Sequence, residues 1–298
     1  MYPRAFRYHR AGSLQEAVTM LSELGEEAKI LAGGQSLIPL MKLRFASPRH
    51  LVDLNFVPGL SYVEQGQDEL RFGPLTRHAE IEHSQEASQI PLLHDCATGI
   101  ADVQVRNRGT IGGSLAEADP SGDWTTALLT LSTHVRCVGP QGERTVPLPE
   151  FTADAYTTVL AHDELVREVV VKVPPKNSGG VYLAVKRCAP VYATASVAVQ
   201  LTLADKDTCQ KAGIALGAVG LTPIKATAAE AALRGQKITK KTIEAAAEAA
   251  MAAADPQPDM RGSAEYKRRL VGILVQRAID IAVRRCRGER VEVSHYYA

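Results

Sequence analysis

The sequence predicts an α+β protein of two domains, and three observations lead to this prediction. In the first part of the chain, short apolar runs alternate with helical patterns that have recognisable starts and stops. A stretch rich in proline and glycine, residues 174–180, then interrupts the pattern. Beyond it, three strand-like runs precede three helical ones. We therefore expect domains at 1–175, with subdomains at about 1–56 and 57–175, and at 176–290.

The first subdomain is expected to form a small β–α–β-like unit. Ser13 opens a capping box before an apolar repeat at helical spacing, and Gly25 ends that helix. Residues 28–31 and 50–54 have the composition of buried strands. Between them, Ser36 is expected to cap a short helix that ends near residue 43.

The second subdomain is expected to mix strands, helices and one hairpin. Residues 139–142 are a glycine- and proline-containing turn between two of its strands. The expected strands are 70–73, 134–138, 143–146 and 165–173, and the expected helices are 77–83, 92–100 and 124–131.

The C-terminal domain is expected to be a three-stranded antiparallel meander followed by helices. The expected strands are 181–187, 194–203 and 213–219, and the expected helices are 224–233, 239–253 and 263–286. The last helix is amphipathic, with an apolar stripe of Tyr266, Leu270, Ile273, Leu274, Ala278, Ile281 and Ala282. This domain offers no nucleophile–base pair and no phosphate loop.

The composition excludes several classes of function. The 298 residues are 45% hydrophobic and 22% charged, as in ordinary soluble proteins, and the net charge of +1 gives no field for nucleic acid or an anionic membrane. No apolar run is long enough to span a bilayer, and the first residues do not resemble a signal peptide. We therefore expect a cytoplasmic protein without a membrane span.

The five cysteines do not form a metal-binding pattern. They are scattered, with no C-x-x-C pair and no histidine at ligand spacing. This excludes a zinc-finger pattern and a ligand set for an iron–sulfur cluster. If the protein performs redox chemistry, its electron carrier is organic or lies on another chain.

Two glycine clusters, residues 32–36 and 110–114, carry the strongest functional signal. Glycine allows positive φ and close approach of a ligand, and successive backbone N–H groups in such turns converge on an anion. Either cluster alone is equally well a tight turn between a strand and a helix. Two clusters of similar design, with hydroxyls at Ser36 and Thr110, predict that one diphosphate is held between two loops.

Charged residues near the second cluster have competing interpretations. A carboxylate about 6 Å from a phosphate is repelled by roughly 3 kcal/mol at an effective dielectric near 20. Asp123 therefore suits ribose hydroxyls, and Asp119 suits a bracing role, although either is also a candidate helix N-cap. Arg106 and Arg108 contact phosphates, hold the loop or meet a partner chain.

One lysine and two histidines are further candidates for a functional role. Lys186 lies on an expected strand, where it either reaches the ligand from the second domain or is a solvated strand residue. His78 and His94 lie on expected helices without acid or nucleophile neighbours, and we interpret both as structural.

The segments 32–37 and 104–114, followed by Asp119 and Asp123, resemble the FAD-binding medium subunits of molybdenum hydroxylases. The pattern is most similar to carbon monoxide dehydrogenase medium chains and more distantly similar to xanthine dehydrogenase flavin domains. The resemblance covers nearly the whole chain. It implies a two-part FAD-binding domain of the vanillyl-alcohol-oxidase type, followed by the C-terminal domain particular to these subunits.

The resemblance also implies a set of cofactor-binding residues, with no catalytic residue and no metal site on this chain. One side of the FAD diphosphate would be cradled by Leu31, Ala32, Gly33, Gly34, Gln35, Ser36, Leu37 and Ile38, and the other by Thr110, Ile111, Gly112, Gly113 and Ser114. Asp123 would hold the adenosine ribose, Ile100 would line the flavin, Val166 would contact the adenine end, Lys186 would approach from the second domain, and Tyr192 would lie near the isoalloxazine.

Three positions depart from the family pattern. Gln35 stands where histidine is frequent, and Ser114 where aspartate or asparagine is common. Both keep hydrogen-bonding capacity. Val191 stands where an acid is usual, which changes the local environment of the flavin but not the expectation of FAD.

The function implied by the resemblance is electron transfer. The chain would carry FAD, receive electrons from the 2Fe–2S clusters of a small subunit, and deliver them to an external acceptor. A large subunit with the molybdenum cofactor would perform the substrate chemistry and decide the substrate, in a dimer of heterotrimers. A stand-alone flavin oxidoreductase on the same fold is the alternative, and a nucleotide-binding module without flavin is a second one.

Overall fold

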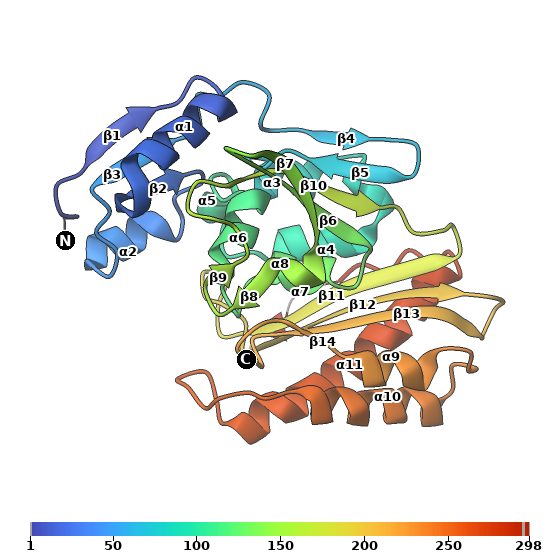
Figure 1. Ribbon diagram of the computed structural model, residues 1–298. Coiled ribbons are helices and arrows are strands. Elements are labelled where there is room, and N and C mark those ends of the chain that lie inside the picture. Colours follow the sequence, from blue (N-terminus) through green and yellow to red (C-terminus); the bar gives the residue numbers. More distant parts are fainter. Residues whose placement is uncertain (1, 294–295, 298) are drawn as a thin grey trace.

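Three sheets lie in succession along the chain in this computed structural model, which describes residues 2–293 and 296–297 (Figure 1). The first has three strands, the other two have five each, and a two-stranded ribbon is added to the middle part. This mixed arrangement agrees with the expected α+β class. Within the described residues, no helix is both long and apolar enough to cross a bilayer.

The N-terminal unit is a parallel sheet with strand order β1-β3-β2. Its elements are β1 (Arg7–Arg10), α1 (Leu14–Leu24), β2 (Ala28–Leu31), α2 (Leu37–Leu43) and β3 (His50–Asp53), with a 3₁₀ turn at Gly25–Glu27.

The helix signals in this unit are largely confirmed. The Ser13 hydroxyl accepts from the Glu16 N–H, and Gly25 ends α1 with φ +61. The expected cap at Ser36 is wrong, because its hydroxyl makes no capping bond to α2. Strand β1 carries no clear apolar pattern, since most of it is exposed, and it was not anticipated.

The middle unit contains an antiparallel sheet with strand order β4-β5-β10-β6-β7. Its strands are β4 (Val63–Gln65), β5 (Glu69–Phe72), β6 (Thr133–Gly139), β7 (Gly142–Pro147), β8 (Thr152–Asp154), β9 (Thr157–Thr158) and β10 (Leu165–Lys172). Its helices are α3 (His78–His83), α4 (Pro91–Gly99), α5 (Val103–Arg106), α6 (Ile111–Glu117), α7 (Asp123–Leu128) and α8 (Leu148–Phe151), with a 3₁₀ turn at Ala87–Gln89. The expected hairpin is confirmed as β6–β7.

The C-terminal sheet has strand order β14-β13-β12-β11-β15. Its strands are β11 (Ser178–Lys186), β12 (Ala195–Leu203), β13 (Cys209–Gly217), β14 (Ile224–Lys225) and β15 (Tyr296–Tyr297), and its helices are α9 (Thr227–Leu233), α10 (Lys240–Ala253) and α11 (Ala264–Cys286). The three-stranded meander is therefore its centre, and the expectation of only three strands is wrong because a short strand is added at each edge.

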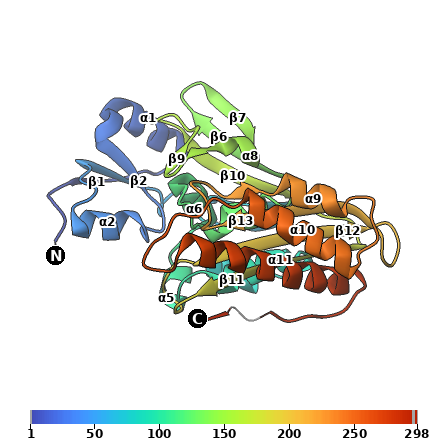
Figure 2. The ribbon, with the colours of Figure 1, turned by 90° about the horizontal axis from the view of Figure 1, so that it is seen from below.

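Helices cover both faces of the meander. Its own α9, α10 and α11 lie on one side, as Figure 2 shows from below, and α4 and α7 of the middle unit contact the other. Burial on both faces explains why β12 is buried along its whole length, including its polar residues Ser196, Gln200 and Thr202. The middle and C-terminal parts are thus packed through a shared apolar layer.

The apolar stripe expected on the last helix is rotated in the structure. Leu274, Ala278 and Ala282 are buried as expected, but Tyr266 and Ile273 are 41% and 47% exposed. The buried face instead continues through Val271, Val275, Ile279 and Val283. The helix is apolar over a wide arc, so packing against the sheet, rather than periodicity, selects the face that is buried.

Candidate functional site

A cavity lies where the loop after β2, the segment from α4 to α7 and the β11–β12 connection meet. Most of the residues expected to bind the cofactor line it. These are Ala32, Gly33, Gly34, Gln35, Ser36, Leu37, Ile100, Thr110, Gly113, Ser114, Asp123, Lys186 and Tyr192. Segments that are far apart in the sequence, between residues 30 and 192, therefore converge on one site.

The first glycine loop offers a series of unused donors. Gly34 has φ +71, which favours glycine, and the chain then turns directly into α2. Among the described residues, none accepts a hydrogen bond from the backbone N–H groups of residues 33–37. Successive free N–H groups of this kind form an anion-binding concavity. The first loop thus has the donor set that a diphosphate requires.

The second loop differs, because its N–H groups are already engaged. Those of Ile111 and Gly112 donate to the Thr76 and Pro74 carbonyls at 3.0 and 3.1 Å, and that of Gly113 donates to the Thr110 hydroxyl oxygen at 3.1 Å. The expected cradle of amides on this side is therefore wrong in its chemistry. What this loop can offer to a ligand is the hydroxyl hydrogens of Thr110 and Ser114.

The two loops touch each other at glycine. A Cβ atom on Gly33 would lie 2.4 Å from the Arg108 carbonyl oxygen and 2.8 Å from Gly109 Cα. A Cβ on Gly113 would lie 2.7 Å from the Thr110 hydroxyl oxygen and 3.7 Å from Ala32 Cβ. Close approach of the neighbouring backbone thus explains Gly33, and the Thr110 side chain of its own loop explains Gly113, as directly as ligand binding does.

A bridge that sequence reasoning missed holds the loops together. Asn55 donates to the Ala32 carbonyl at 2.9 Å and accepts from the Arg77 guanidinium at 2.5 Å. Arg77 also donates to the Arg108 carbonyl at 2.5 Å. Asn55 lies two residues after the end of β3, at the carboxyl end of a parallel strand, and that position was the available signal.

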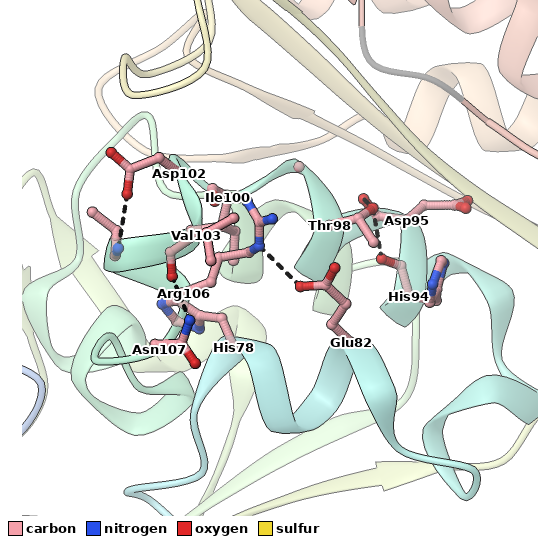
Figure 3. Close-up of polar contacts among 12 residues, drawn as sticks. His78, Glu82, His94, Asp95, Thr98, Ile100, Asp102, Val103, Arg106 and Asn107 are labelled. Atoms are coloured by element: carbon pink, nitrogen blue, oxygen red, sulfur yellow. Dashed lines mark hydrogen bonds and ion pairs between the residues drawn. The ribbon is translucent and has the colours of Figure 1, made fainter.

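One of the two arginines beside the second loop, Arg106, has a structural role. Arg106 pairs with Glu82 at 2.9 Å and donates to the Ile100 carbonyl at 3.1 Å, as Figure 3 shows for the ion pair. Neither Arg106 nor Arg108 lines the cavity. Of the interpretations open for Arg106, holding the loop is the one that these contacts support.

A buried polar group forms one wall of the cavity. Lys186, on β11, is 1% exposed, donates to the Gly99 carbonyl and lies 3.8 Å from Asp123 Oδ1. The same Asp123 oxygen accepts from the Tyr182 hydroxyl at 2.5 Å. Burial and the Asp123 charge raise the pKa of Tyr182 well above its usual value, so the phenol stays protonated. Lys186 and Asp123 thus offset each other's charge and join the C-terminal sheet to α7.

Acidic residues gather at another part of the cavity wall. Asp119 braces its own loop by accepting from the Ser121 N–H at 2.8 Å, and it lies 3.4 Å from the Tyr156 hydroxyl. Burial and the neighbouring Asp119 raise the pKa of Glu117. Carboxylates here repel a phosphate but can accept from hydroxyl or ring N–H groups. The cavity therefore has a phosphate-compatible end at residues 33–37 and an acidic end.

Several expected residues do not line the cavity. Ile111 is fully buried in the core, Gly112 faces Pro74, and Leu31 and Ile38 lie just outside the turn. Val166 lies on β10, paired with Cys137 in the middle sheet, and the structure does not bring it to the site. The residues that line it without having been singled out for ligand binding are Ile30, His78, Ala101, Val105, Gly109, Glu117, Asp119, Gly122, Pro190 and Val191.

Comparison with known proteins identifies the family of the chain that forms this cavity. Residues 4–175 match the family described as "FAD binding domain in molybdopterin dehydrogenase", and residues 180–282 match the "CO dehydrogenase flavoprotein C-terminal domain". The chain belongs to the FAD-binding medium subunits of molybdenum hydroxylases. Its cofactor is therefore FAD, and it is an oxidoreductase subunit.

Individual relatives cover essentially the whole chain. The carbon monoxide dehydrogenase medium chain of Hydrogenophaga pseudoflava is 39% identical over 96% of this chain and 100% of its own length. The 6-hydroxypseudooxynicotine dehydrogenase complex subunit alpha of Paenarthrobacter nicotinovorans is 38% identical over 99% and 100%. A solved structure of the Hydrogenophaga pseudoflava carbon monoxide dehydrogenase superposes with a TM-score of 0.94, at 41% identity over 96% of this chain and 100% of that one.

The residues present fit FAD. The free N–H groups of residues 33–37 suit the diphosphate, which they can bind without a neutralising cation. The hydroxyls of Thr110 and Ser114 and the carboxylate of Asp123 suit polar parts of the cofactor. No cysteine lines the cavity, and burial lowers the pKa of its one histidine, His78, to about 3.

Proposed function

We propose that this chain is the FAD-carrying electron-transfer subunit of a heterotrimeric molybdenum hydroxylase. Electrons would arrive from 2Fe–2S clusters on a small subunit and leave to an external acceptor. The substrate would react at the molybdenum cofactor of a large subunit, in a dimer of heterotrimers. The proposal also places the complex in the cytoplasm.

The observation that carries this proposal is the series of unused backbone N–H groups at residues 33–37, which line the cavity. The lining offers these five N–H groups to a cofactor, and no cysteine is among the residues that form it. Bound FAD would supply the redox chemistry by accepting and releasing electrons. The protein's own groups would hold the diphosphate at residues 33–37 and keep the wall at Asp123 and Lys186 fixed.

The geometry supports individual roles for several residues at the site. We propose that Asp123 accepts a hydrogen bond from a ribose hydroxyl with the carboxylate oxygen that Tyr182 does not occupy. Tyr192, 40% exposed beside the cavity, would lie near the isoalloxazine, and Ile100 would pack on the flavin. Lys186 would act mainly by fixing Asp123, because its ammonium group is bound to the Gly99 carbonyl.

We propose the vanillyl-alcohol-oxidase type for the FAD-binding part and a division of the chain at residues 175 and 176. The family match that ends at residue 175 supports this division. The separate sheets of the N-terminal and middle units support the finer division at about residue 56.

The exposed surface of the N-terminal unit supports the proposal that this chain binds a partner subunit. This short unit exposes many large apolar side chains, and such exposure is typical of a surface that another protein covers. They are Tyr2, Phe6, Tyr8, Leu43, Phe45 and Phe56. We propose that this set, the N-terminal apolar surface, contacts a partner subunit.

The first test is purification of the tagged chain from its native host, with an absorption spectrum and a gel of the copurifying proteins. Flavin released by acid as FAD, together with one large and one small companion, is the expected result. Flavin without companions would favour the stand-alone oxidoreductase. A colourless protein that ignores added FAD would overturn the proposal.

A further inference from the structure

His78 has an unusual environment for a histidine that the sequence suggests is structural. It begins α3, is 5% exposed, and lines the cavity next to the second glycine loop. Its Nδ1 atom accepts a hydrogen bond from the indole N–H of Trp124 at 2.9 Å. An indole nitrogen can only donate, so Nδ1 carries no proton and the ring proton is on Nε2.

The imidazole of His78 is fixed in one tautomer, and it is also kept neutral. Burial, with smaller contributions from the positive charges of Arg77 and Arg106, lowers the pKa of His78 to about 3. Figure 3 shows His78 beside the segment that carries Arg106, at the start of α3. Above this pH, His78 is therefore a fixed neutral donor at Nε2 rather than a titrating group.

The Nε2 atom lies at the second glycine loop. A Cβ atom on Gly109 would lie 2.6 Å from it, and the His78 backbone N–H donates to the Gly109 carbonyl at 3.1 Å. Among the described residues, no group accepts a hydrogen bond from Nε2. Nε2 is not one of the fully buried atoms that lack a partner, so it keeps accessible surface, and His78 lines the cavity, where a ligand oxygen can accept from this N–H.

This donor also fills a deficit of the second loop. The N–H groups of Ile111, Gly112 and Gly113 are used within the protein, so this side of the cavity must supply donors from side chains. His78 provides one that loses no conformational freedom on binding, since Trp124 fixes its ring. A donor fixed in advance contributes more affinity than a mobile one.

We propose that His78 is a cofactor-binding residue, whose Nε2–H donates a hydrogen bond to an oxygen of the diphosphate–ribityl part of FAD. Trp124 is the positioning residue for this donor. The inference rests on FAD as the cofactor of this cavity, and not on the identity of the partners or acceptor.

Two substitutions separate the two nitrogen atoms. In His78→Asn, the amide oxygen can take the place of Nδ1 and keep the Trp124 bond, but no donor reaches the place of Nε2. In His78→Gln, the longer side chain can place its amide N–H near Nε2 but no longer offers an acceptor in the place of Nδ1. The experiment measures FAD affinity of the full chain, after removal and titration of FAD, for the parent and both variants.

We expect His78→Asn to bind FAD about tenfold or more weakly, and His78→Gln to stay within about threefold of the parent. Trp124 is the only tryptophan, so its single indole N–H resonance reports the other bond. That resonance should move in His78→Gln and stay in place in His78→Asn. Unchanged FAD affinity in both variants, or equal losses in both, would overturn the proposal.

A measurement on the parent covers the case in which a variant folds poorly. The ¹⁵N shifts of the His78 imidazole should show the neutral form with its proton on Nε2, and the Nε2 signal should move when FAD binds. A proton on Nδ1, or an Nε2 signal indifferent to FAD, would contradict the inference. Failure of the parent to bind FAD would instead contradict the cofactor assignment, so the two failures are distinguishable.

Discussion

The guanidinium of Arg285 contacts both carboxylate oxygens of Asp95, at 2.6 and 3.1 Å, with both side chains buried. Asp95 lies on α4 of the middle unit, and Arg285 lies near the end of α11. The same guanidinium donates to the Gly180 carbonyl on β11 and to the Val291 carbonyl. One side chain thus joins four segments that are distant in the sequence, on both sides of the C-terminal sheet.

Removing this guanidinium should destabilise the fold. Arg285→Met leaves the Asp95 carboxylate buried without its charge partner, which typically costs about 3–5 kcal/mol in the free energy of unfolding. Urea unfolding measures this loss. Arg284→Met is the matched control, because the neighbouring arginine forms only an exposed pair with Glu289 and should leave the unfolding midpoint in place. A midpoint for Arg285→Met equal to that of the control would contradict the account.

The contact of the two loops predicts a loss of FAD affinity in Gly33→Ala. The new Cβ would meet the Arg108 carbonyl oxygen at 2.4 Å, and backbone atoms cannot move aside as a side chain can. The loops must therefore separate, and we expect FAD binding at least about tenfold weaker, roughly one hydrogen bond's worth. Flavin titration measures it. Gly12→Ala, where the nearest atom is the flexible end of Glu16 at 3.3 Å, should bind FAD normally.

The buried neutral His78 predicts a specific acid sensitivity. Its pKa is about 3 in the folded protein, against an ordinary value of 6.5. Between these values the unfolded chain binds the proton and the folded one does not, so stability falls as pH is lowered from about 6.5 toward 3.

The His78→Gln variant isolates this effect. The parent should lose up to about 1.4 kcal/mol per pH unit more than the variant in that window, and both should have parallel stability above pH 7. Denaturant unfolding at a series of pH values provides the comparison. Parallel curves across the whole range would show that His78 does not resist protonation in the folded state.

The N-terminal apolar surface predicts a variant that loses its partner but keeps its cofactor. Phe45 is 81% exposed, so Phe45→Glu should leave the fold and FAD content unchanged and weaken copurification of a companion subunit. Leu221→Glu is the control, because Leu221 is 69% exposed but lies in the C-terminal part. Equal recovery of companions with both variants would place the partner contact elsewhere.

Local signals in the sequence determined the helix caps and turns, which depend on interactions between neighbouring residues. The Ser13 cap, the positive φ at Gly25 and Gly34, and the β6–β7 turn depend on a few consecutive residues, and they were predicted correctly or fit the pattern that predicted them. The two glycine clusters also identified the cavity, because a turn that brings backbone N–H groups together is encoded by adjacent residues.

The tertiary structure decided everything that depends on contacts between distant segments. Sequence spacing could not show that the second loop's N–H groups are used by Pro74, Thr76 and Thr110, or that α11 buries a rotated face. It could not show whether His78 is only structural or is a hydrogen-bond donor fixed in place, because that depends on contacts with Trp124 and Gly109, which are distant in the sequence. The sequence by itself therefore determined which loops can hold a diphosphate, and the packing of distant elements decided which of their donors remain free for it.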